Sequence, residues 1–539
     1  MTDADVDTLL IGIDAGCLPV FRRLFDEGAI PAIESLCTDG FSAPMESQIP
    51  PWTPSAWPSL YTGVNPGKHG VYGFVTYEGY DWRVVSAADV GEFTLWELLD
   101  RHDRSSVVVN APVTAPPPAI DGAVVPGFMG AEDPDCHPPG TLDDVRDAVG
   151  EYRIYPSYHT DDETYTDDEK IDEYERLVGM RGDAFRYLVH RHDPDFGFVQ
   201  FQRPDTVFHE FDDNWDAARR VYEATDDAIA AILADCDPDR VFLASDHGMG
   251  RYERPQFRVN DYLREEGYVS GAKGGKGMPG WSPIRQQLRR GEDSDSWEPS
   301  LVERAAAHAA SVGLTADRVR AALERVNLAD TVSQHVPSNV SQTGSEQVDF
   351  AESTAYLRAR TELGVRINLE GREPDGVVPP ERYDEVRSEL IETLQSVEAP
   401  GGQPVFEEVG PREDYFHGPE LEDAVDVVIV PNDFQHFLSD QLVGEPFGER
   451  KTAWNHKRNG VFVASGTGID ESTTCDPHLF DVAPTILASM GIAPNDRMDG
   501  TVLPVTDPEP PRSYPSYGTE TVDMDADIEG RLADLGYIE

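Results

Sequence analysis

The chain has 539 residues and a large excess of acid, because 100 aspartates and glutamates stand against 44 lysines and arginines, for a net charge of −56. Binding to a nucleic-acid polymer requires a basic surface, so this composition excludes that class of function. The sequence also contains no apolar stretch of about 18 residues, so we expect no membrane-spanning helix and no membrane partner.

The cysteines and the N-terminus predict the compartment. Five cysteines are scattered along the chain without paired spacing, which is typical of a reducing environment. The first residues are acidic and lead directly into an apolar run, so no signal peptide is predicted and we expect a cytoplasmic protein. The acidic residues separate regular apolar runs, so we expect a folded core under a solvated acidic surface, which is similar to that of proteins from halophilic archaea.

The first half of the chain alternates short apolar runs with amphipathic stretches. Buried strands are predicted at 7–14, 107–110, 196–201 and 240–245, with an extended segment at 40–43. Helices are predicted at 19–27, 173–190 and 215–234. The Pro- and Asp-rich stretch 115–165 predicts a long, partly ordered excursion. Strands that alternate with helices predict an α/β fold with a mostly parallel central sheet flanked by helices.

The alternation breaks after residue 268 and resumes near residue 356. Residues 265–350 combine a Gly-rich stretch with helical patterns rich in Arg, Glu and Ala, and we predict that they form an inserted cap. Residues 1–264 and 351–505 would then form one discontinuous core. Its later strands are predicted at 365–369, 424–431 and 460–465, and its later helices at 380–396 and 479–490. The Pro-rich and then acidic residues 506–539 are predicted to be a tail.

Aspartate and histidine recur where predicted strands end. Asp14 ends the first strand, and Asp246 and His247 follow the strand at 240–245. The carboxyl ends of parallel strands meet at one edge of a sheet, where α/β proteins place their active sites. These residue types are ligands for divalent metals, although an aspartate in this position also serves as a helix N-cap.

Three further candidates follow or precede other predicted strands. Asp205 and His209 come after the strand at 196–201, and their spacing of four residues puts both on one helix face. His456 precedes the strand at 460–465; a lone histidine is more often structural than a ligand. Since two metals need about three protein ligands each, we expect one site from Asp205, His209 and His456. The other site would combine Asp14, Asp246, His247 and the hydroxyl of Thr53.

Thr53 lies at the start of a helix predicted to run to residue 63. Threonine is a common N-cap, which is one interpretation of this residue. A hydroxyl at a helix start also lies near free backbone N–H groups that favour an anion, so a metal-activated Thr53 could be a nucleophile toward phosphate. The sequence leaves both roles open. Trp52 and Trp57 flank it and could form core packing, a pocket wall or a platform for a flat leaving group.

Together these segments resemble the alkaline phosphatase superfamily, and specifically its type I phosphodiesterase/nucleotide pyrophosphatase branch. The matching segments are 13–15 (IDA), 50–70 (PPWTPSAWPSLYTGVNPGKHG), 204–209 (PDTVFH), 245–250 (SDHGMG), 455–466 (NHKRNGVFVASG) and 481–492 (DVAPTILASMGI). The resemblance implies an alkaline-phosphatase-like core in which Thr53 is the nucleophile. It also implies that Asp14, Asp246 and His247 join Thr53 at one metal, that Asp205, His209 and His456 hold the second, and that Lys68 and His69 are mainly structural.

The predicted function is the hydrolysis of phosphate esters through a covalent phosphothreonine on Thr53. The substrate class is a phosphodiester, a nucleotide pyrophosphate or a phosphomonoester, and a small phosphate ester or nucleotide is the expected partner. Two divalent metal ions are the expected cofactors; nitrogen and carboxylate ligands suit Zn²⁺, and Mn²⁺ also fits. The alternatives are a phosphotransferase similar to phosphoglycerate mutase on the same scaffold, and a catalytically inactive, metal-dependent binding protein.

Overall fold

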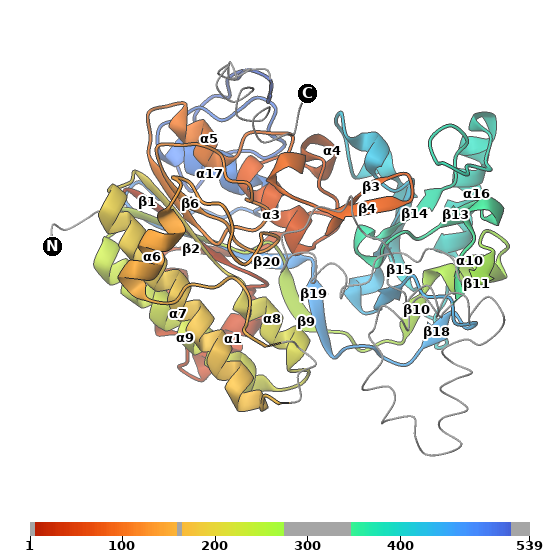
Figure 1. Cartoon of the computed structure of the whole chain (residues 1–539), viewed down its shortest axis with the longest axis horizontal. Coiled ribbons are helices and arrows are strands. Elements are labelled where there is room, and N and C mark those ends of the chain that lie inside the picture. Colours follow the sequence, from red (N-terminus) through yellow and green to blue (C-terminus); the bar gives the residue numbers. More distant parts are fainter. Residues whose placement is uncertain (1–5, 159–163, 274–345, 519–539) are drawn as a thin grey trace, which may run out of the picture.

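The structure, a computed structural model, describes residues 6–158, 164–273 and 346–518, and its centre is a seven-stranded sheet (Figure 1). In spatial order the strands are β2 (Phe41–Glu46), β20 (Asn459–Gly466), β8 (Arg240–Ala244), β1 (Thr8–Ile13), β7 (Phe196–Phe201), β5 (Ser106–Val109) and β6 (Gly122–Val125). The five strands from β8 to β6 are parallel to one another, whereas β20 is antiparallel to both β8 and β2. The predicted α/β fold with a mostly parallel sheet is therefore confirmed.

Helices cover both faces of this sheet because the strands are apolar on both faces. Within β1, Leu9 and Ile11 belong to one core and Leu10 to the other, as the two-residue period of a strand requires. The first face carries α1 (Leu18–Asp26), α2 (Pro31–Asp39), α6 (Thr141–Val149), α7 (Asp167–His192), α8 (Arg203–Glu210) and α9 (Trp215–Cys236). The second face carries α3 (Thr53–Thr62), α5 (Leu95–Asp100) and α17 (Val482–Ser489).

One prediction about this core is wrong. The sequence predicts a partly ordered excursion over 115–165, but this stretch contains the edge strand β6 and the helix α6. The strand has only four residues, all buried, and it lies between Pro-rich and Asp-rich segments. A run this short gives no periodic signal of its own, and its parallel pairing with β5 is what makes it a strand.

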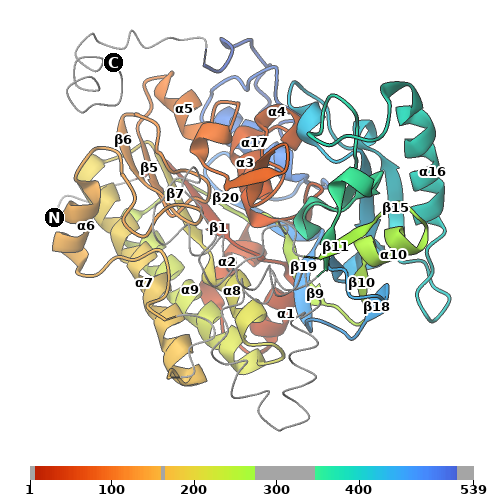
Figure 2. The ribbon, with the colours of Figure 1, turned by 45° about the vertical axis from the view of Figure 1, so that its right-hand side comes forward.

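A second lobe is built mainly from residues 252–273 and 346–448 (Figures 1 and 2). Its main sheet has the order β13 (Ala355–Tyr356), β14 (Gly364–Ile367), β16 (Val427–Pro431) and β15 (Phe406–Pro411), and α16 (Tyr383–Gln395) and α10 (Val259–Glu265) pack in the same hydrophobic core. Smaller sheets join β17 (Leu438–Ser439), β10 (Gln256–Arg258) and β18 (Phe447–Gly448), and pair β11 (Gly271–Lys273) with β12 (Glu346–Val348). Of the predicted core segment 351–505, the strands from β13 to β16 belong to this sheet, whereas β20 belongs to the main sheet.

The structure describes only parts of the predicted cap and of the predicted tail. Residues 274–345 of the predicted cap and residues 519–539 of the predicted tail lie outside the described residues, so the domain boundaries stay predictions. Within the described part of the tail, Tyr514 is buried and its hydroxyl lies 2.7 Å from Nε2 of His102. In the ranges the structure describes, none of the helices has the length and apolarity needed to cross a bilayer.

Three short elements lie near the junction of the two lobes. The helix α4 (Pro66–His69) is followed by the hairpin β3 (Val75–Glu78) and β4 (Asp81–Val84). Between the lobes, β9 (Gly248–Arg251) pairs with β19 (Trp454–Lys457) in an antiparallel ladder (Figure 1). This ladder brings residue 456 to the end of β8, although about 200 residues separate the two along the chain.

Candidate metal centre

The candidate ligands converge at the carboxyl edge of the parallel strands. Asp14 follows β1, and Asp246 and His247 follow the neighbouring strand β8. Asp205 and His209 lie on α8, which begins just after β7, the other neighbour of β1. His456 lies on β19 opposite Met249, two residues beyond His247. The structure thus brings all of these residues, with Thr53, into one site.

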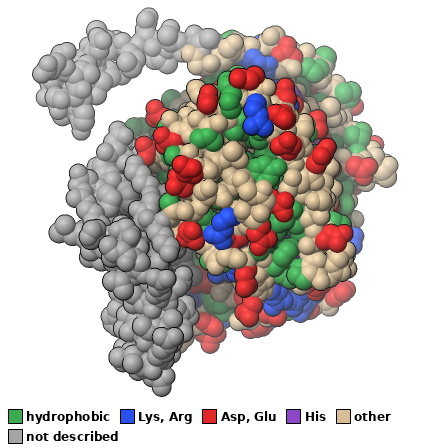
Figure 3. Space-filling view, turned by 90° about the vertical axis from the view of Figure 1, so that its right-hand side faces the viewer, with side chains coloured by type: hydrophobic (Ala, Val, Ile, Leu, Met, Phe, Trp, Pro, Cys, Tyr) green, Lys and Arg blue, Asp and Glu red, His purple; other side chains and the backbone are tan. Residues whose placement is uncertain are grey.

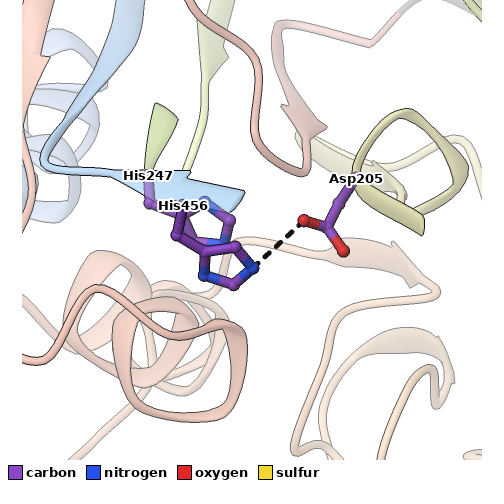
Figure 4. Close-up of side chains that lie close together, drawn as sticks. All are labelled: Asp205, His247 and His456. Carbon is purple, nitrogen blue, oxygen red and sulfur yellow. Dashed lines mark ion pairs between the residues drawn. The ribbon is translucent and has the colours of Figure 1, made fainter. Parts of the chain in front are cut away.

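The first group of ligand atoms consists of Asp205, His209 and His456. Nε2 of His209 lies 3.1 Å from Oδ1 of Asp205 and 3.0 Å from Nε2 of His456, and the Asp205 and His456 atoms are 3.2 Å apart. Figure 4 shows the side chains of Asp205 and His456 pointing at one another, with His247 behind His456. His209 is the most exposed member of this group.

The second group consists of Asp14, Asp246, His247 and Thr53. Nε2 of His247 lies 3.1 Å from Oδ2 of Asp246 and 3.5 Å from Oδ1 of Asp14. The imidazoles of His247 and His456 are stacked with their centroids 3.7 Å apart, so the two groups adjoin. His247 consequently lies within ligand distance of both groups, and it belongs to each of the two clusters that could hold a metal ion.

Thr53 is not the N-cap of its helix. The N-cap of α3 is Trp52, in an extended conformation and without a side-chain cap, and Thr53 is the first helical residue. Its hydroxyl lies 3.3 Å from Oδ1 of Asp14 and 3.4 Å from Nε2 of His247. The hydroxyl therefore faces the candidate ligands, and the structural interpretation of this residue as an N-cap is wrong.

The histidines are oriented to present Nε2 to a metal. Nδ1 of His247 lies 3.1 Å from the carbonyl oxygen of Gly248, and Nδ1 of His456 lies 3.0 Å from that of Pro51. Because a carbonyl can only accept, each Nδ1 carries the proton and donates it, which leaves the Nε2 lone pair for a ligand. Backbone acceptors fix metal-binding histidines in this way in many proteins.

The carboxylates also fit a cation. Oδ2 of Asp246 is buried and has no hydrogen-bond partner among the described residues, although it lies 3.1 Å from Nε2 of His247. Two acceptor atoms that face one another at this distance, fully buried, are what a bound cation would join. The donor set of imidazole nitrogens, carboxylate oxygens and one hydroxyl therefore suits divalent metals such as Zn²⁺ and Mn²⁺.

Burial and neighbouring charges shift the pKa values of the candidate ligands. Burial, followed by the charges of Asp246 and Asp205, raises the pKa of Asp14 well above its ordinary value. Burial opposes ionisation of Asp205 too, but His209 and His456 hold its pKa well below the ordinary range. Burial lowers the pKa of His456 to about 4, so this imidazole is a neutral ligand at physiological pH.

Two residues that the sequence did not predict as partners of Asp14 contact its carboxylate. Gln200 on β7 donates through Nε2 to Oδ2 of Asp14 at 2.9 Å, and the indole Nε1 of Trp57 donates to the same oxygen at 3.3 Å. A signal for Gln200 was present, because it is the one polar residue of the buried strand FGFVQF. Trp57 is fully buried, so of its predicted roles core packing is correct, with the indole N–H as an added contact to the site.

The remaining motif residues, which are not candidate ligands, make packing, hydrogen-bond and salt-bridge contacts. The ring of Trp52 lies 4.4 Å from that of His456 and packs against the core of the second lobe. His69 is fully buried and bonded to the Ser59 hydroxyl at 2.8 Å. Lys68 bridges to Asp499 near the C-terminal end of the core. The His69 contact thus joins α4 to α3, and the Lys68 contact joins α4 to the chain at residue 499.

Comparison with solved structures shows that the fold is similar to that of an alkaline phosphatase and of a phosphonoacetate hydrolase. Wild-type alkaline phosphatase PafA matches with a TM-score of 0.53 and 13% identity, over 94% of this chain and 99% of that one. Phosphonoacetate hydrolase from Sinorhizobium meliloti 1021, in complex with phosphonoformate, matches with a TM-score of 0.50 and 16% identity, over 89% and 95% of the respective chains. No curated protein sequence matches the chain significantly.

The family of the chain follows from a match to a family model built on sequence. The model of the type I phosphodiesterase/nucleotide pyrophosphatase family matches residues 8–461, which is most of the chain. The chain belongs to this family. Its members are metal-dependent hydrolases of phosphoesters, in agreement with the acidic and histidine clusters at the strand ends.

Proposed function

We propose that this protein hydrolyses small phosphate esters or nucleotides with two divalent metal ions and Thr53 as the nucleophile. The observation that carries the proposal is the position of the Thr53 hydroxyl, which lies in the first turn of a helix and within 3.4 Å of ligand atoms of Asp14 and His247. A family match alone would fit many phosphoesterase mechanisms; the hydroxyl inside the ligand cluster supports this one.

The ligand sets follow from the two groups of atoms. Asp205, His209 and His456 would hold one ion, and Asp14, Asp246, His247 and Thr53 the other. When bound, the ions supply neutralisation of the phosphoryl oxygens and of the leaving oxygen, and they lower the pKa of the Thr53 hydroxyl. Zn²⁺ is the expected ion, and Mn²⁺ suits the same donors.

The chain's own residues then perform a two-step displacement. Asp14 orients the Thr53 hydroxyl, and Oγ1 attacks phosphorus, so that an O–P bond forms while the bond to the leaving oxygen breaks. Water next attacks the phosphothreonine, which releases the phosphoryl product and restores the hydroxyl. The net reaction adds one water across the P–O bond of the substrate, and the backbone at the start of α3 favours the anionic group throughout.

The setting of the reaction is also a proposal. The acidic composition supports a salt-adapted cytoplasmic protein, and Figure 3 shows acidic side chains spread over the face of the second lobe with few basic ones between them. Substrate selection would fall to the insert at 265–350, because every candidate ligand lies outside it. A phosphotransferase similar to phosphoglycerate mutase is the alternative that the same Thr53 geometry supports.

The decisive experiment is to trap the phosphoenzyme. Zn²⁺-loaded protein in molar KCl is incubated with p-nitrophenyl phosphate, bis-p-nitrophenyl phosphate or p-nitrophenyl thymidine monophosphate, quenched in acid and analysed by mass spectrometry. We expect the phosphoryl group on the Thr53 peptide, with release of p-nitrophenol. Phosphate that reaches an added acceptor alcohol instead of water would favour the phosphotransferase.

Substitution of the nucleophile gives the matching kinetic test. Thr53→Ala should lower kcat at least 10³-fold, about 4 kcal/mol, and Thr53→Ser should keep substantial activity because it retains the hydroxyl. Thr62→Ala is the matched control, since Thr62 ends the same helix and its hydroxyl donates to the carbonyl of Pro58. If Thr53→Ala kept more than about a tenth of kcat, a loss below about 1.4 kcal/mol, direct attack by water would be the better mechanism.

A further inference from the structure

The two oxygens of the Asp14 carboxylate have different surroundings. Oδ1 faces the site, 3.3 Å from the Thr53 hydroxyl and 3.5 Å from Nε2 of His247. Oδ2 accepts two hydrogen bonds from neutral donors, from Nε2 of Gln200 at 2.9 Å and from Nε1 of Trp57 at 3.3 Å. The donors occupy Oδ2 and fix the plane of the carboxylate, so Oδ1 is the oxygen left for a metal.

Gln200 is itself held in one orientation. It is fully buried on β7, where it is in register with Gly12 of β1, two residues before Asp14. Its Oε1 accepts from Nδ2 of Asn110 at 2.8 Å, and the same Asn110 amide group donates to the backbone oxygen of Gln200 at 2.9 Å. Because Oε1 is the acceptor in that bond, Nε2 must point to the other side, toward Asp14.

Asn110 can make these bonds because of its backbone. It is the first residue after β5 and adopts a left-handed conformation with φ of 64°, which asparagine tolerates better than most residues. Its own N–H donates to the carbonyl of Val125 on β6 at 2.9 Å. The bonds therefore run from the edge strand β6 through residues at β5 and β7 to Asp14, the residue that follows β1.

The second donor, Trp57, is positioned by a close approach to the sheet. A Cβ atom on Gly12 would lie 2.6 Å from Cη2 of the Trp57 ring, so only glycine leaves room for the indole at this point. The ring is fully buried under α3, the helix that carries Thr53. The same helix thus supplies both a donor to Oδ2 and the hydroxyl beside Oδ1.

We infer that Gln200, oriented by Asn110, is a positioning residue that sets the metal affinity of the Asp14 site. The inference rests on the proposed function, because it assumes a metal at Oδ1 of Asp14. The Gln200 amide contacts neither metal nor substrate in this scheme and acts only through the carboxylate. Residues that orient metal ligands in this way commonly change metal affinity by about 10- to 100-fold when they are replaced.

The test is a titration of metal-free protein with Zn²⁺ in molar KCl, by calorimetry with a competing chelator. Gln200→Met keeps the length of the side chain but removes the donor, and we expect about 10- to 100-fold weaker binding at one of two sites and unchanged binding at the other. To assign the affected site, the substitution is repeated in an Asp205→Asn background, where the weakened site should be the one that remains. Gln256→Met is the matched control, since Gln256 is a buried glutamine of the second lobe.

A second variant keeps the test independent of folding. Asn110→Gly preserves the left-handed backbone and removes only the amide, so it should weaken the same site by a smaller factor. A purely structural role would lower the melting temperature of metal-free Gln200→Met and of Gln256→Met without changing either Zn²⁺ affinity. Wild-type affinities at both sites in folded Gln200→Met and Asn110→Gly would overturn the inference and leave the proposed function standing. A wild-type protein that binds no Zn²⁺ would instead overturn the proposed function, and the inference with it.

Discussion

Buried carboxylates occur in two regions of this protein, and the two regions differ in whether an arginine pairs with them. In the second lobe four buried acids have arginine partners: Asp261 pairs with Arg264, Glu362 with Arg358, Glu373 with Arg366 and Arg372, and Asp426 with Arg372. At the strand ends of the first lobe, Asp14, Asp205 and Asp246 are also buried, yet in the described part of the chain no lysine or arginine pairs with them.

The difference separates structural charge from functional charge. A buried carboxylate costs several kcal/mol of desolvation unless it is paired, so the second lobe neutralises its acids with guanidinium groups. The first lobe gathers three acids around histidine imidazoles and leaves one carboxylate oxygen, Oδ2 of Asp246, without a hydrogen-bond partner among the described residues. We infer that neutralisation there is left to bound metal ions, in agreement with the metal dependence of this family.

The largest expected effect comes from removing one of the unpaired acids. Asp246→Asn removes a charged ligand from the Asp14 site, so it should lower kcat by about 10³-fold or more and reduce the bound metal toward one ion per chain. Steady-state kinetics and elemental analysis measure the two effects. Glu362→Gln, an equally conservative change of a buried acid in the second lobe, should leave kcat near the wild-type value. Equal activity losses in both variants would remove the distinction between the two regions.

The next effect is on stability and belongs to the second lobe. Arg358 donates to both carboxylate oxygens of Glu362, and both residues are buried, at 4% and 6% exposure. Arg358→Met leaves Glu362 as an uncompensated buried charge, which should lower the free energy of unfolding by about 3–5 kcal/mol. Urea denaturation measures this loss. The control is Arg382→Met, because the pair of Arg382 with Glu385 is exposed and its removal should cause no measurable change.

A smaller effect of opposite sign is expected in the first lobe. In metal-free protein, Asp14→Asn removes a buried charge that Asp246 and Asp205 repel, so the variant should be more stable than the wild type. A higher free energy of unfolding for Asp14→Asn than for the wild type is therefore expected in urea denaturation with EDTA. A destabilised metal-free Asp14→Asn would mean that these acids are compensated within the chain.

Acidification should remove both the destabilising charge of Asp14 and the stabilising ion pair of Asp426, over different pH ranges. The pKa of Asp14 is raised by burial and by Asp246, so its penalty is full above the raised pKa and disappears as the pH falls to the unfolded value of about 3.9. Burial opposes ionisation of Asp426, but Arg372 lowers its pKa below the ordinary value. The stability that this pair contributes is therefore full above about pH 3.9 and is lost as the pH falls through the lowered pKa.

The measurement is a pH series of urea denaturations on metal-free protein. The advantage of Asp14→Asn should shrink as the pH falls below the raised pKa of Asp14, whereas the penalty of Asp426→Asn should shrink only as the pH falls through the lowered pKa of Asp426. An advantage of Asp14→Asn that does not change with pH would show that the substitution acts through packing and not through charge.

Much of the first lobe was predictable from the sequence because its signals are local. Apolar runs with intervening helical patterns predicted β1, β7 and β8 within one or two residues, and polar residues just after them predicted the site. The carboxyl ends of parallel strands meet at one edge, so ligands far apart in the sequence are expected to lie close together in space. The spacing of Asp205 and His209 likewise depends only on the helix period.

The tertiary structure decided which strand pairs with which. The run at 427–431 is fully buried and apolar, like the strands of the main sheet, yet it lies in the second lobe beside β14 and β15. A short apolar run is equally suited to either sheet, so only long-range packing distinguishes them. The same holds for β6, whose four residues become a strand through their pairing with β5.

The sequence by itself therefore determined the fold class, the family and the residue types gathered at the strand ends, because period, composition and motif are properties of neighbouring residues. Only the tertiary structure turned Thr53 from a possible helix cap into a hydroxyl facing Asp14, and only it placed His247 between the two ligand groups. It also revealed the bonds from Asn110 through Gln200 to Asp14, since hydrogen-bond partners on adjacent strands are set by the register of the sheet. Register is fixed by packing across the whole core and cannot be seen in any one segment.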